Sequence, residues 1–296
     1  RGEKIRRYKK MKKFTVENAC DSSDYILNKY GEALTFGRLM KLYRQKDVKV
    51  NGKRINKRVR LEKGDEIEVY FDGENAGSPA SEKPPIKTDY SDENIVICEK
   101  PPKISSEDFY ERVKGKYPQS IYTHRLDTNT RGLIFFALNQ KAYDELYKGL
   151  KNRDFKKYYY CVVNGKVENL SGVLNGFLFK DAKKGEVKIY DEKVRGALPV
   201  KTAYEVIAQG ENSSLLKVEL ITGRTHQIRA HLAHAGHFIL GDGKYGVEKI
   251  NRTQKAKGQL LVSAEIVFKF DKGEQLYYLN GKDFKINCDF LKAYLY

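Results

Sequence analysis

Residues 124–133 have the sequence His-Arg-Leu-Asp-Thr-Asn-Thr-Arg-Gly-Leu, and an apolar run over residues 133–138 follows directly. A continuous apolar run of this length, bounded by turn-forming residues, is typical of a buried strand. The stretch therefore predicts a polar turn that leads into the interior of a sheet. Asp127 lies within that turn, where an aspartate often does no more than cap the turn with its side chain.

Two further segments are rich in residue types that carry chemistry. Residues 157–165, Lys-Tyr-Tyr-Tyr-Cys-Val-Val-Asn-Gly, are by themselves typical of a tyrosine-rich core strand. Residues 222–231, Thr-Gly-Arg-Thr-His-Gln-Ile-Arg-Ala-His, follow a predicted strand and are dense in polar groups. An ordinary core does not accept so many polar groups without hydrogen-bond partners, so this segment is a candidate functional site.

Alternating patterns dominate the larger, C-terminal part of the chain. Strands are predicted over residues 95–98, 133–138, 158–163, 202–207, 215–221 and 261–270, and a helix over 142–150. Alternation of apolar and polar residues suits antiparallel sheets with one solvated face. The absence of regular crossover helices disfavours a doubly wound nucleotide-binding fold. The predicted fold class is α+β, with a mixed, mostly antiparallel sheet.

The formal charge is the strongest signal in the composition. The 296 residues include 56 Lys and Arg against 39 Asp and Glu, a net charge of +17, together with 21 Tyr. Positive charge concentrates polyanions, and aromatic faces stack on unpaired bases. RNA is therefore the favoured partner over solubility alone. No apolar run approaches the roughly 20 residues that span a bilayer, and no membrane partner is expected.

The cysteines and the first residues indicate the compartment. Cys20, Cys98, Cys161 and Cys288 lie far apart, with neither a metal-ligand spacing nor a dense disulfide framework. Residues 1–13 are basic, but no apolar segment follows them, so they are not a secretory signal. We expect reduced thiols and a cytoplasmic protein.

A linker is predicted around residues 74–85, because this stretch contains small, polar and proline residues and no periodic pattern of apolar residues. The expected organisation is a basic tail over 1–13, a small α/β domain over 14–73, a linker over 74–88 and a large domain over 89–296. The small domain shows helical spacing near residues 25–30 and 34–43, and Asn51-Gly52 predicts a hairpin. Nine basic and two acidic residues between Arg44 and Lys63 favour a phosphate-binding surface over a merely solvated one.

Four histidines suggest a metal site as an alternative. His226, His231, His234 and His237 lie close in sequence, but on a helix the first and last would be roughly 16 Å apart. No acidic residue or cysteine lies between them to complete a site. We expect no metal and interpret these histidines as structural or RNA-facing. Residues 241–246 lack the spacing of a phosphate loop and are interpreted as a turn.

Together these segments resemble the RluA-type family of RNA pseudouridine synthases. Residues 124–133 match its His-Arg-Leu-Asp motif followed by Thr-x-Gly-Leu, and residues 222–231 match its Thr-Gly-Arg-x-His-Gln-Ile-Arg-x-His motif. Between them Lys157 and Tyr159 match its Lys-x-Tyr strand, and Lys100 matches the lysine of its Lys-Pro turn. The resemblance covers about residues 90–270.

The small domain resembles the S-four-like RNA-binding domain over residues 39–44, 48–52 and 64–67. Within the family this domain is typical of enzymes that act on large ribosomal RNA. The chain departs from the usual patterns at Arg131, where the family has Ser, at Ser263, where many members have His, and at Lys46, where the RNA-binding domain has Gly. Residues 22–24, Ser-Ser-Asp, also replace its usual Arg-Leu-Asp.

The resemblance implies an isomerase that converts uridine to pseudouridine and needs no cofactor, because nothing is oxidised and no group is lost. It assigns the essential carboxylate to Asp127, with Arg229 as its ion partner. It assigns Tyr159 as the active-site tyrosine, whose ring can stack on uracil and whose phenol could help remove the proton from the new attachment carbon. Attack on the anomeric carbon, attack on the base and removal of a sugar proton stay open as roles for the carboxylate. Arg125 is assigned to the space vacated by a flipped nucleotide, and His124 and Arg224 to the loop or to RNA.

On this hypothesis a monomer binds large-subunit ribosomal RNA or a precursor ribosomal particle. The expected RNA-binding residues of the small domain are Arg38, Lys41, Lys49, Lys53 and Arg54. Two alternatives stay open from the sequence: a non-catalytic RNA-binding or assembly factor that uses the same surfaces, and a metal-dependent hydrolase built on the histidines. Which uridines are modified is likewise open at this point.

Overall fold

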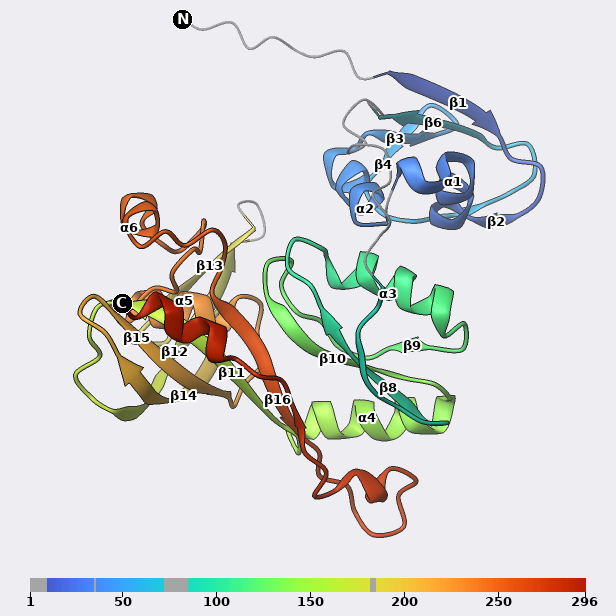
Figure 1. Cartoon of the computed structure of the whole chain (residues 1–296). Coiled ribbons are helices and arrows are strands. Elements are labelled where there is room, and N and C mark those ends of the chain that lie inside the picture. The colour runs from blue at the N-terminus through green and yellow to red at the C-terminus, as the bar shows by residue number, and fades with distance from the viewer. Residues whose placement is uncertain (1–9, 35, 72–84, 182–184) are drawn as a thin grey trace, which may run out of the picture. The chain divides into compact units, whose positions relative to one another are not determined.

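The chain divides into two compact units, Arg1–Pro85 and Ile86–Tyr296, each described here by itself. The structure is a computed structural model, and it describes residues 10–34, 36–71, 85–181 and 185–296 (Figure 1). Most of the predicted linker, residues 74–84, and residues 1–9 of the predicted tail lie outside the described residues. The first strand begins at Met11, within the stretch expected to be tail.

The N-terminal unit packs two helices against a small antiparallel sheet. The sheet has the order β1 (Met11–Thr15), β6 (Glu66–Tyr70), β3 (Val48–Val50) and β4 (Lys53–Ile55), and β2 (Cys20–Asp21) pairs separately with β5 (Arg60–Leu61). Helices α1 (Ser22–Tyr30) and α2 (Phe36–Gln45) cover the two helical patterns of the sequence. The predicted hairpin turn joins β3 to β4, with Asn51 at φ 47° and Gly52 at φ 75°. These left-handed angles explain the Asn-Gly pair.

The C-terminal unit is built on one large sheet of eleven strands. Nine of them follow the order β13-β12-β14-β15-β11-β16-β10-β8-β7, while β9 pairs with β10 and β17 with β16. The pair β10 and β16 is parallel and every other strand pair among the described residues is antiparallel, which confirms the α+β prediction. The strands are β7 (Thr88–Ser91), β8 (Ile95–Lys100), β9 (Ile121–Tyr122), β10 (Arg131–Ala137), β11 (Lys156–Asn164), β12 (Ser171–Asp181), β13 (Glu186–Tyr190), β14 (Leu198–Gln209), β15 (Ser213–Leu220), β16 (Leu261–Val267) and β17 (Phe284–Lys285).

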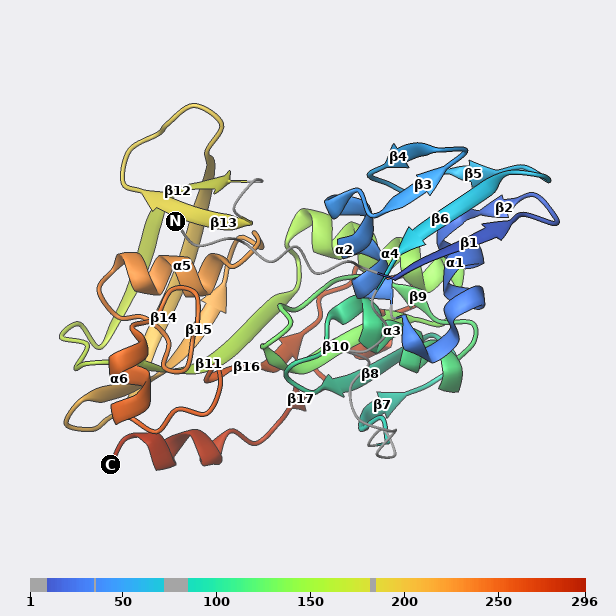
Figure 2. The same ribbon diagram turned by 90° about the horizontal axis from the view of Figure 1, so that it is seen from above.

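Helices α3 (Ser106–Lys116) and α4 (Gln140–Asn152) cover opposite faces of β8 and β10, as Figures 1 and 2 show. Ile134 and Phe136 pack in the same apolar cluster as α3, whereas Leu133 and Phe135 pack in the cluster that contains α4. Both faces of β10 are therefore buried. A strand of this kind has no polar face, which is why residues 133–138 form an unbroken apolar run.

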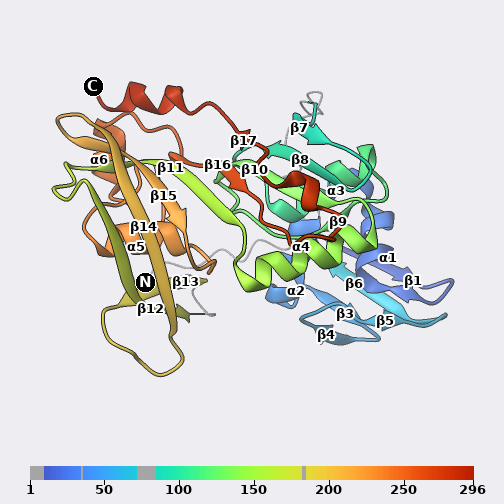
Figure 3. The same ribbon diagram turned by 90° about the horizontal axis from the view of Figure 1, so that it is seen from below.

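Helix α5 (Gln227–His234) packs against β12, β13 and β14 at the other end of the sheet. In the view from below, β11 and β16 run between these strands and the half that carries α3 and α4 (Figure 3). The short helix α6 (Glu248–Thr253) precedes β16, and a 3-10 helix over Asp289–Tyr294 contacts β11 and β15. The turn before β10 and the N-terminus of α5 both lie beside the central strand β11, and this arrangement positions the site.

Gly132 makes the close parallel pairing of β10 and β16 possible. Its φ is 118°, and a side chain on it would collide with the backbone carbonyl of Ser263 on β16. Only glycine tolerates both the angle and the close approach. Because residues 127–130 directly precede this pairing, the glycine lets the Asp127 turn lie against the central strands.

Candidate active site

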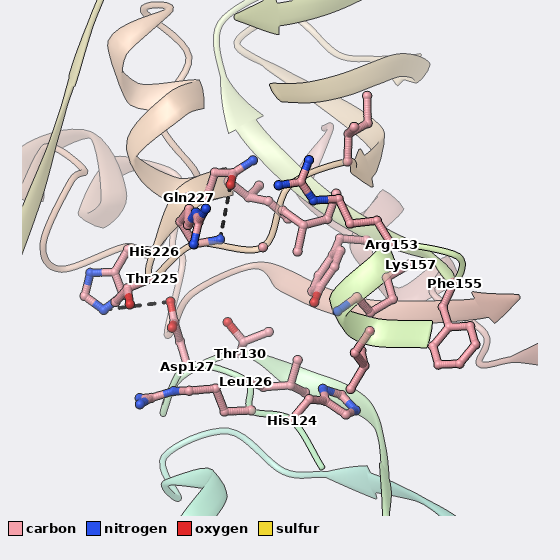
Figure 4. A pocket seen from close by; sticks show the side chains of 18 of the residues that line it. His124, Leu126, Asp127, Thr130, Arg153, Phe155, Lys157, Thr225, His226 and Gln227 are labelled. Atoms are coloured by element: carbon pink, nitrogen blue, oxygen red, sulfur yellow. Dashed lines mark hydrogen bonds and ion pairs between the residues drawn. The ribbon is translucent and has the colours of Figure 1, made fainter. Parts of the chain in front are cut away.

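The three segments singled out in the sequence line one cavity of about 550 Å³ in the C-terminal unit (Figure 4). The turn before β10 contributes Asp127, strand β11 contributes Tyr159, and the first turn of α5 contributes Arg229. The end of α4 closes another side of the cavity. Residues that are about 100 positions apart in sequence therefore line one cavity.

The turn that carries Asp127 is fixed by a lysine buried beneath it. Lys100 is fully buried, and its ammonium donates hydrogen bonds to the carbonyl oxygens of Pro101, Ile104 and Thr128 at 2.9–3.1 Å. Burial lowers the pKa of Lys100 to about 8, and the nearby Asp127 charge opposes that shift. Ser106 adds a second attachment, because its hydroxyl accepts from the amide of Leu126 and donates to the carbonyl of the same residue, both at 2.8 Å. The lysine of the Lys-Pro turn therefore holds the backbone of the loop.

A chain of three charges begins at the wall of the cavity, where Asp127 and Arg229 line it, and ends at Asp242 behind them. Arg229 donates through Nη1 to Asp127 Oδ2 at 2.8 Å, and through Nε and Nη2 to the two oxygens of Asp242 at 2.7 and 3.0 Å. The Asp242 side chain is completely buried and also accepts from the amides of Lys244 and Tyr245. Burial raises the pKa of Asp242, but Arg229 and these amides outweigh it and hold that pKa below its usual value. Two carboxylates therefore fix one guanidinium.

Tyr245 and His226 extend this network. The Arg229 guanidinium lies 5.1 Å from the centre of the Tyr245 ring, and the Tyr245 hydroxyl lies 2.9 Å from Nδ1 of His226. The His226 Nε2 faces Asp127 Oδ2 across 3.9 Å (Figure 4). His226 has a left-handed backbone, with φ 55°, at the position before α5. Few residues other than glycine adopt this conformation, so the surrounding fold must hold the histidine in place.

Tyr159 is 6% exposed and lies on β11 beside the cavity. Burial raises the pKa of its phenol well above the usual value, and the Asp127 charge adds to that effect, while a hydrogen bond with Ser263 opposes it. The phenol is therefore protonated at neutral pH. This state suits a ring that stacks on a base better than a group that accepts a proton.

The other three residues that the sequence assigned to this site, Arg125, Arg224 and His124, differ in exposure. Arg125 is exposed and lies 3.6 Å from Glu107. The exposed Arg224 also lines the cavity. His124 packs its ring against Phe135 at 4.1 Å and accepts from the amide of that residue through Nε2. Burial lowers the pKa of His124 well below its usual value, so the imidazole is neutral and supports the loop, whereas the two arginines face the solvent.

The five RNA-binding candidates of the N-terminal unit have different surroundings. Arg38, Lys41, Lys53 and Arg54 are exposed, and Arg54 donates to the carbonyl of Lys46 at 2.8 Å. Lys49 is half-buried and donates to Glu68 at 2.9 Å and to the hydroxyl of Tyr70 at 2.8 Å. Glu68 therefore already balances the charge of Lys49, which distinguishes it from Lys53 on the same hairpin.

The four histidines of the candidate metal site have separate partners, and the partner of His226 is the Tyr245 hydroxyl. His231 contacts the Thr202 hydroxyl, His234 contacts Asp191, and His237 contacts the carbonyl of Asn164. In the part of the chain that the structure describes, no three His, Cys, Asp or Glu side chains converge as metal ligands would. None of the described helices is long and apolar enough to cross a membrane.

Sequence reasoning missed three residues of the site. Asp242 belongs to residues 241–246, which were interpreted only as a turn; it forms that turn and also binds Arg229. Lys100 was noted within a motif but given no role, and His226 was considered as a metal ligand or as a structural or RNA-facing residue, not as a partner of Asp127. The available signal was an aspartate that follows the apolar run Phe238-Ile239-Leu240 after a single glycine, because a carboxylate in such a place is buried and needs a partner.

Comparisons with known proteins agree with this geometry. Residues 94–234 match the RNA pseudouridylate synthase family. Over 236 residues the chain is 31% identical to an uncharacterized RNA pseudouridine synthase of Mycoplasma pneumoniae, a homologue of MG209, and the match covers 75% of this chain and 76% of that one. Over 256 residues it is 27% identical to the ribosomal large subunit pseudouridine synthase C of Escherichia coli K12, with 80% of each chain covered.

A solved structure has the same fold. The human RNA pseudouridylate synthase domain containing 1 superposes with a TM-score of 0.57 at 21% identity, over 74% of this chain and 97% of that one. Fold, motifs and relatives together define an isomerase that acts on RNA. The chain belongs to the RluA-type family of RNA pseudouridine synthases.

Proposed function

We propose that this enzyme isomerises specific uridines of large-subunit ribosomal RNA, with Asp127 as its essential carboxylate. The observation that carries the proposal is the pairing of Asp127 with Arg229 at the wall of an open cavity. Only Oδ2 of Asp127 is engaged by Arg229, and no described residue forms a hydrogen bond or ion pair with Oδ1. One oxygen is thus oriented by the protein and the other is available to a substrate.

The proposed reaction needs few groups because it is balanced within the substrate. The bond from N1 of uracil to C1′ of ribose breaks, the base turns, and a bond from C5 to C1′ forms. C5 loses a proton and N1 gains one, so no oxidant, reductant or leaving group is required. Asp127 acts at the sugar or the base, Arg229 orients its carboxylate, and Tyr159 supports the uracil ring by stacking.

The charges of the cavity support a polyanionic substrate. Among the described residues that line it, one is acidic, Asp127, and six are Lys or Arg: Arg125, Lys151, Arg153, Lys157, Arg224 and Arg229. Lys157 and Arg153 point into the cavity (Figure 4). Burial lowers the pKa of Lys157, and among the described residues no carboxylate pairs with its ammonium. An RNA phosphate would supply the missing negative charge.

The target class is proposed from the N-terminal unit and from the relatives. The match to a ribosomal large subunit pseudouridine synthase spans 80% of the chain, and the exposed basic residues of α2 and β4 are suited to contact phosphates. We further propose that residues 14–73 form an S-four-like RNA-binding domain, that the enzyme acts as a cytoplasmic monomer on free RNA or a precursor particle, and that it uses no cofactor.

The proposal is tested by mapping pseudouridines in RNA from cells with and without this gene. We expect particular positions of large-subunit ribosomal RNA to lose pseudouridine, and the wild-type gene to restore them while a gene that encodes Asp127→Asn does not. Loss of pseudouridine from another class of RNA, with an unchanged ribosomal map, would show that the target class is wrong. Restoration by the Asp127→Asn gene would remove Asp127 from the mechanism.

A further inference from the structure

The roles proposed so far do not account for the position of the His226 side chain, which faces Asp127 across a gap. The two atoms that face each other, His226 Nε2 and Asp127 Oδ2, are 3.9 Å apart. This distance is too long for a direct hydrogen bond. Both residues line the cavity, and each side chain is 18% exposed. A small polar group of a bound ligand can therefore reach the space between them.

The hydrogen bonds around Tyr245 determine which nitrogen of His226 carries the proton. The amide of Val187 donates to the Tyr245 hydroxyl at 3.2 Å, and that hydroxyl lies 2.9 Å from His226 Nδ1. Among the described residues no other acceptor lies within reach of the phenol proton. The phenol therefore donates to Nδ1, and the proton of the neutral imidazole is on Nε2, which faces Asp127.

The neutral state of His226 follows from its surroundings. Burial lowers the pKa of His226, and the positive charges of Arg229 and Lys244 lower it further, whereas the negative charges of Asp127 and Asp242 oppose the shift. The net effect places the pKa below the ordinary value. At neutral pH the side chain is thus a single directed hydrogen-bond donor rather than a second cation beside Asp127.

The fold holds this donor in place at a conformational cost. His226 is left-handed, and the buried Gln227 next to it accepts from the Thr222 hydroxyl and donates to the hydroxyl of Thr202 and the carbonyl of Lys201. A left-handed non-glycine residue persists only where its surroundings determine it fully. The strain is therefore consistent with a role for the side chain in the cavity.

We propose that the space between His226 and Asp127 is a hydroxyl-binding site, and that it binds the ribose 2′-hydroxyl of the target uridine. This inference rests on the proposed function. A hydroxyl accepts one hydrogen bond and donates another, so it can accept from His226 Nε2–H and donate to the Asp127 carboxylate. Two such bonds of about 2.8 Å each fit a separation of 3.9 Å between the two protein atoms.

The chemistry of an RNA strand selects the 2′-hydroxyl. Within a strand the 3′ and 5′ oxygens are esterified and have no proton to donate to Asp127. The 2′-hydroxyl is attached to the carbon next to C1′, where the reaction breaks its bond, so a carboxylate that serves C1′ also reaches it. This group distinguishes RNA from DNA. His226 would then be a specificity residue, and Tyr245, which orients it, a positioning residue.

The test uses two versions of a synthetic RNA that spans a mapped target site, one with uridine and one with 2′-deoxyuridine at that position. Binding and the single-turnover rate are measured for both. His226→Gly removes the donor and suits the left-handed backbone. His226→Asn keeps a donor and also tolerates that backbone. His234→Gln, at the other end of α5 and outside the cavity lining, is the matched control.

We expect the wild-type enzyme and the His234→Gln control to prefer the uridine RNA. In His226→Gly the preference falls about tenfold, because the deoxy substrate no longer leaves a buried donor unpaired. His226→Asn keeps part of the preference. Tyr245→Phe, which retains the ring over Arg229 but frees Nδ1, lowers the preference less than His226→Gly does.

Two results would overturn the inference. A wild-type preference that His226→Gly leaves unchanged would remove His226 from recognition of the hydroxyl. Equal binding and turnover of both RNAs by the wild-type enzyme would mean that the 2′-hydroxyl does not occupy the site. Failure of the wild-type enzyme to form pseudouridine in the uridine RNA is a different outcome, because it counts against the proposed function itself.

Discussion

The charges around Arg229 and those on the hairpin of the N-terminal unit differ in how they are held. Arg229 has a buried side chain, and it forms hydrogen bonds with both Asp127 and Asp242. Lys53 and Arg54 on β4 are exposed to solvent. Exposed ion pairs are worth about 0–1 kcal/mol, whereas removal of one partner from a buried pair costs about 3–5 kcal/mol. A single substitution among the buried charges around Arg229 should therefore cost much stability, whereas a substitution of an exposed lysine or arginine on the hairpin should cost little.

The largest stability effect is expected for Arg229→Met. The change leaves the fully buried Asp242 without its cation, so the free energy of unfolding should fall by about 3–5 kcal/mol. Urea denaturation followed by circular dichroism measures this loss. A loss of less than about 1 kcal/mol in the free energy of unfolding would mean that this buried pair contributes no more than an exposed ion pair.

A double variant distinguishes the contribution of Arg229 to stability from its contribution to turnover. Arg229→Met with Asp242→Leu removes both buried charges, and well-packed apolar replacements of buried pairs are often neutral in stability. We expect stability to recover while turnover stays low, because Asp127 still lacks its guanidinium. Recovery of turnover together with stability would show that Arg229 acts only on the fold.

Lys100→Met should have the next largest effect. The change leaves the carbonyl oxygens of Pro101, Ile104 and Thr128 without the buried donor that they share, which costs about 2–3 kcal/mol at pH 7. Because Thr128 is one of these residues, turnover should fall as well. Lys87→Met, at an exposed lysine paired with Glu99, is the control and should change stability by less than about 1 kcal/mol.

The stability difference between the wild type and Lys100→Met should depend on pH, because the pKa of Lys100 differs between the folded and unfolded chains. The folded pKa of about 8 lies below the ordinary value of 10.5. Between these values the unfolded chain binds a proton that the folded chain has released, so the stability of the wild type relative to Lys100→Met should increase with pH. A stability difference that decreases over this range would show that the buried ammonium is favoured in the fold.

The smallest effect is expected on the N-terminal hairpin. Lys53→Gln should reduce the slope of the logarithm of RNA affinity against the logarithm of salt concentration by about 0.7–0.9. Lys49→Gln should change the slope less, because Glu68 already balances that charge. Filter binding at several salt concentrations compares the two variants. Equal changes would mean that the Glu68 pair opens when RNA binds.

Local patterns predicted the elements that bury a face. The apolar run of residues 133–138 became β10, and the tyrosine-rich run became β11. Helix α3 was not predicted because its charged sequence offers few apolar positions, of which Phe109 and Val113 are buried. Strand β12 was not predicted because it is largely half-exposed and contains glycine. The strand expected over residues 261–270 ends at Val267, although Phe268 and Phe270 stay in the core.

The motifs identified the candidate residues that lie within a matching segment, but they did not identify residues whose part in the site depends on a long-range pair. The motifs identified Asp127, Tyr159 and Arg229, and the structure brings these residues to one cavity. Asp242 and Lys100 bind partners 13 and 28 positions away, and no local pattern contains such a pair. The tautomer of His226 likewise depends on Val187 and Tyr245, which only the folded sheet places together.

The most direct test of the role of Asp127 compares the wild type and Asp127→Asn on large-subunit ribosomal RNA labelled with tritium at C5 of uracil. The RNA comes from cells that lack the gene, and its binding to both proteins is measured on the same preparations. We predict tritium release by the wild type, no release by Asp127→Asn, and similar RNA affinity for both. Release of tritium by Asp127→Asn at a rate near that of the wild type would contradict the account.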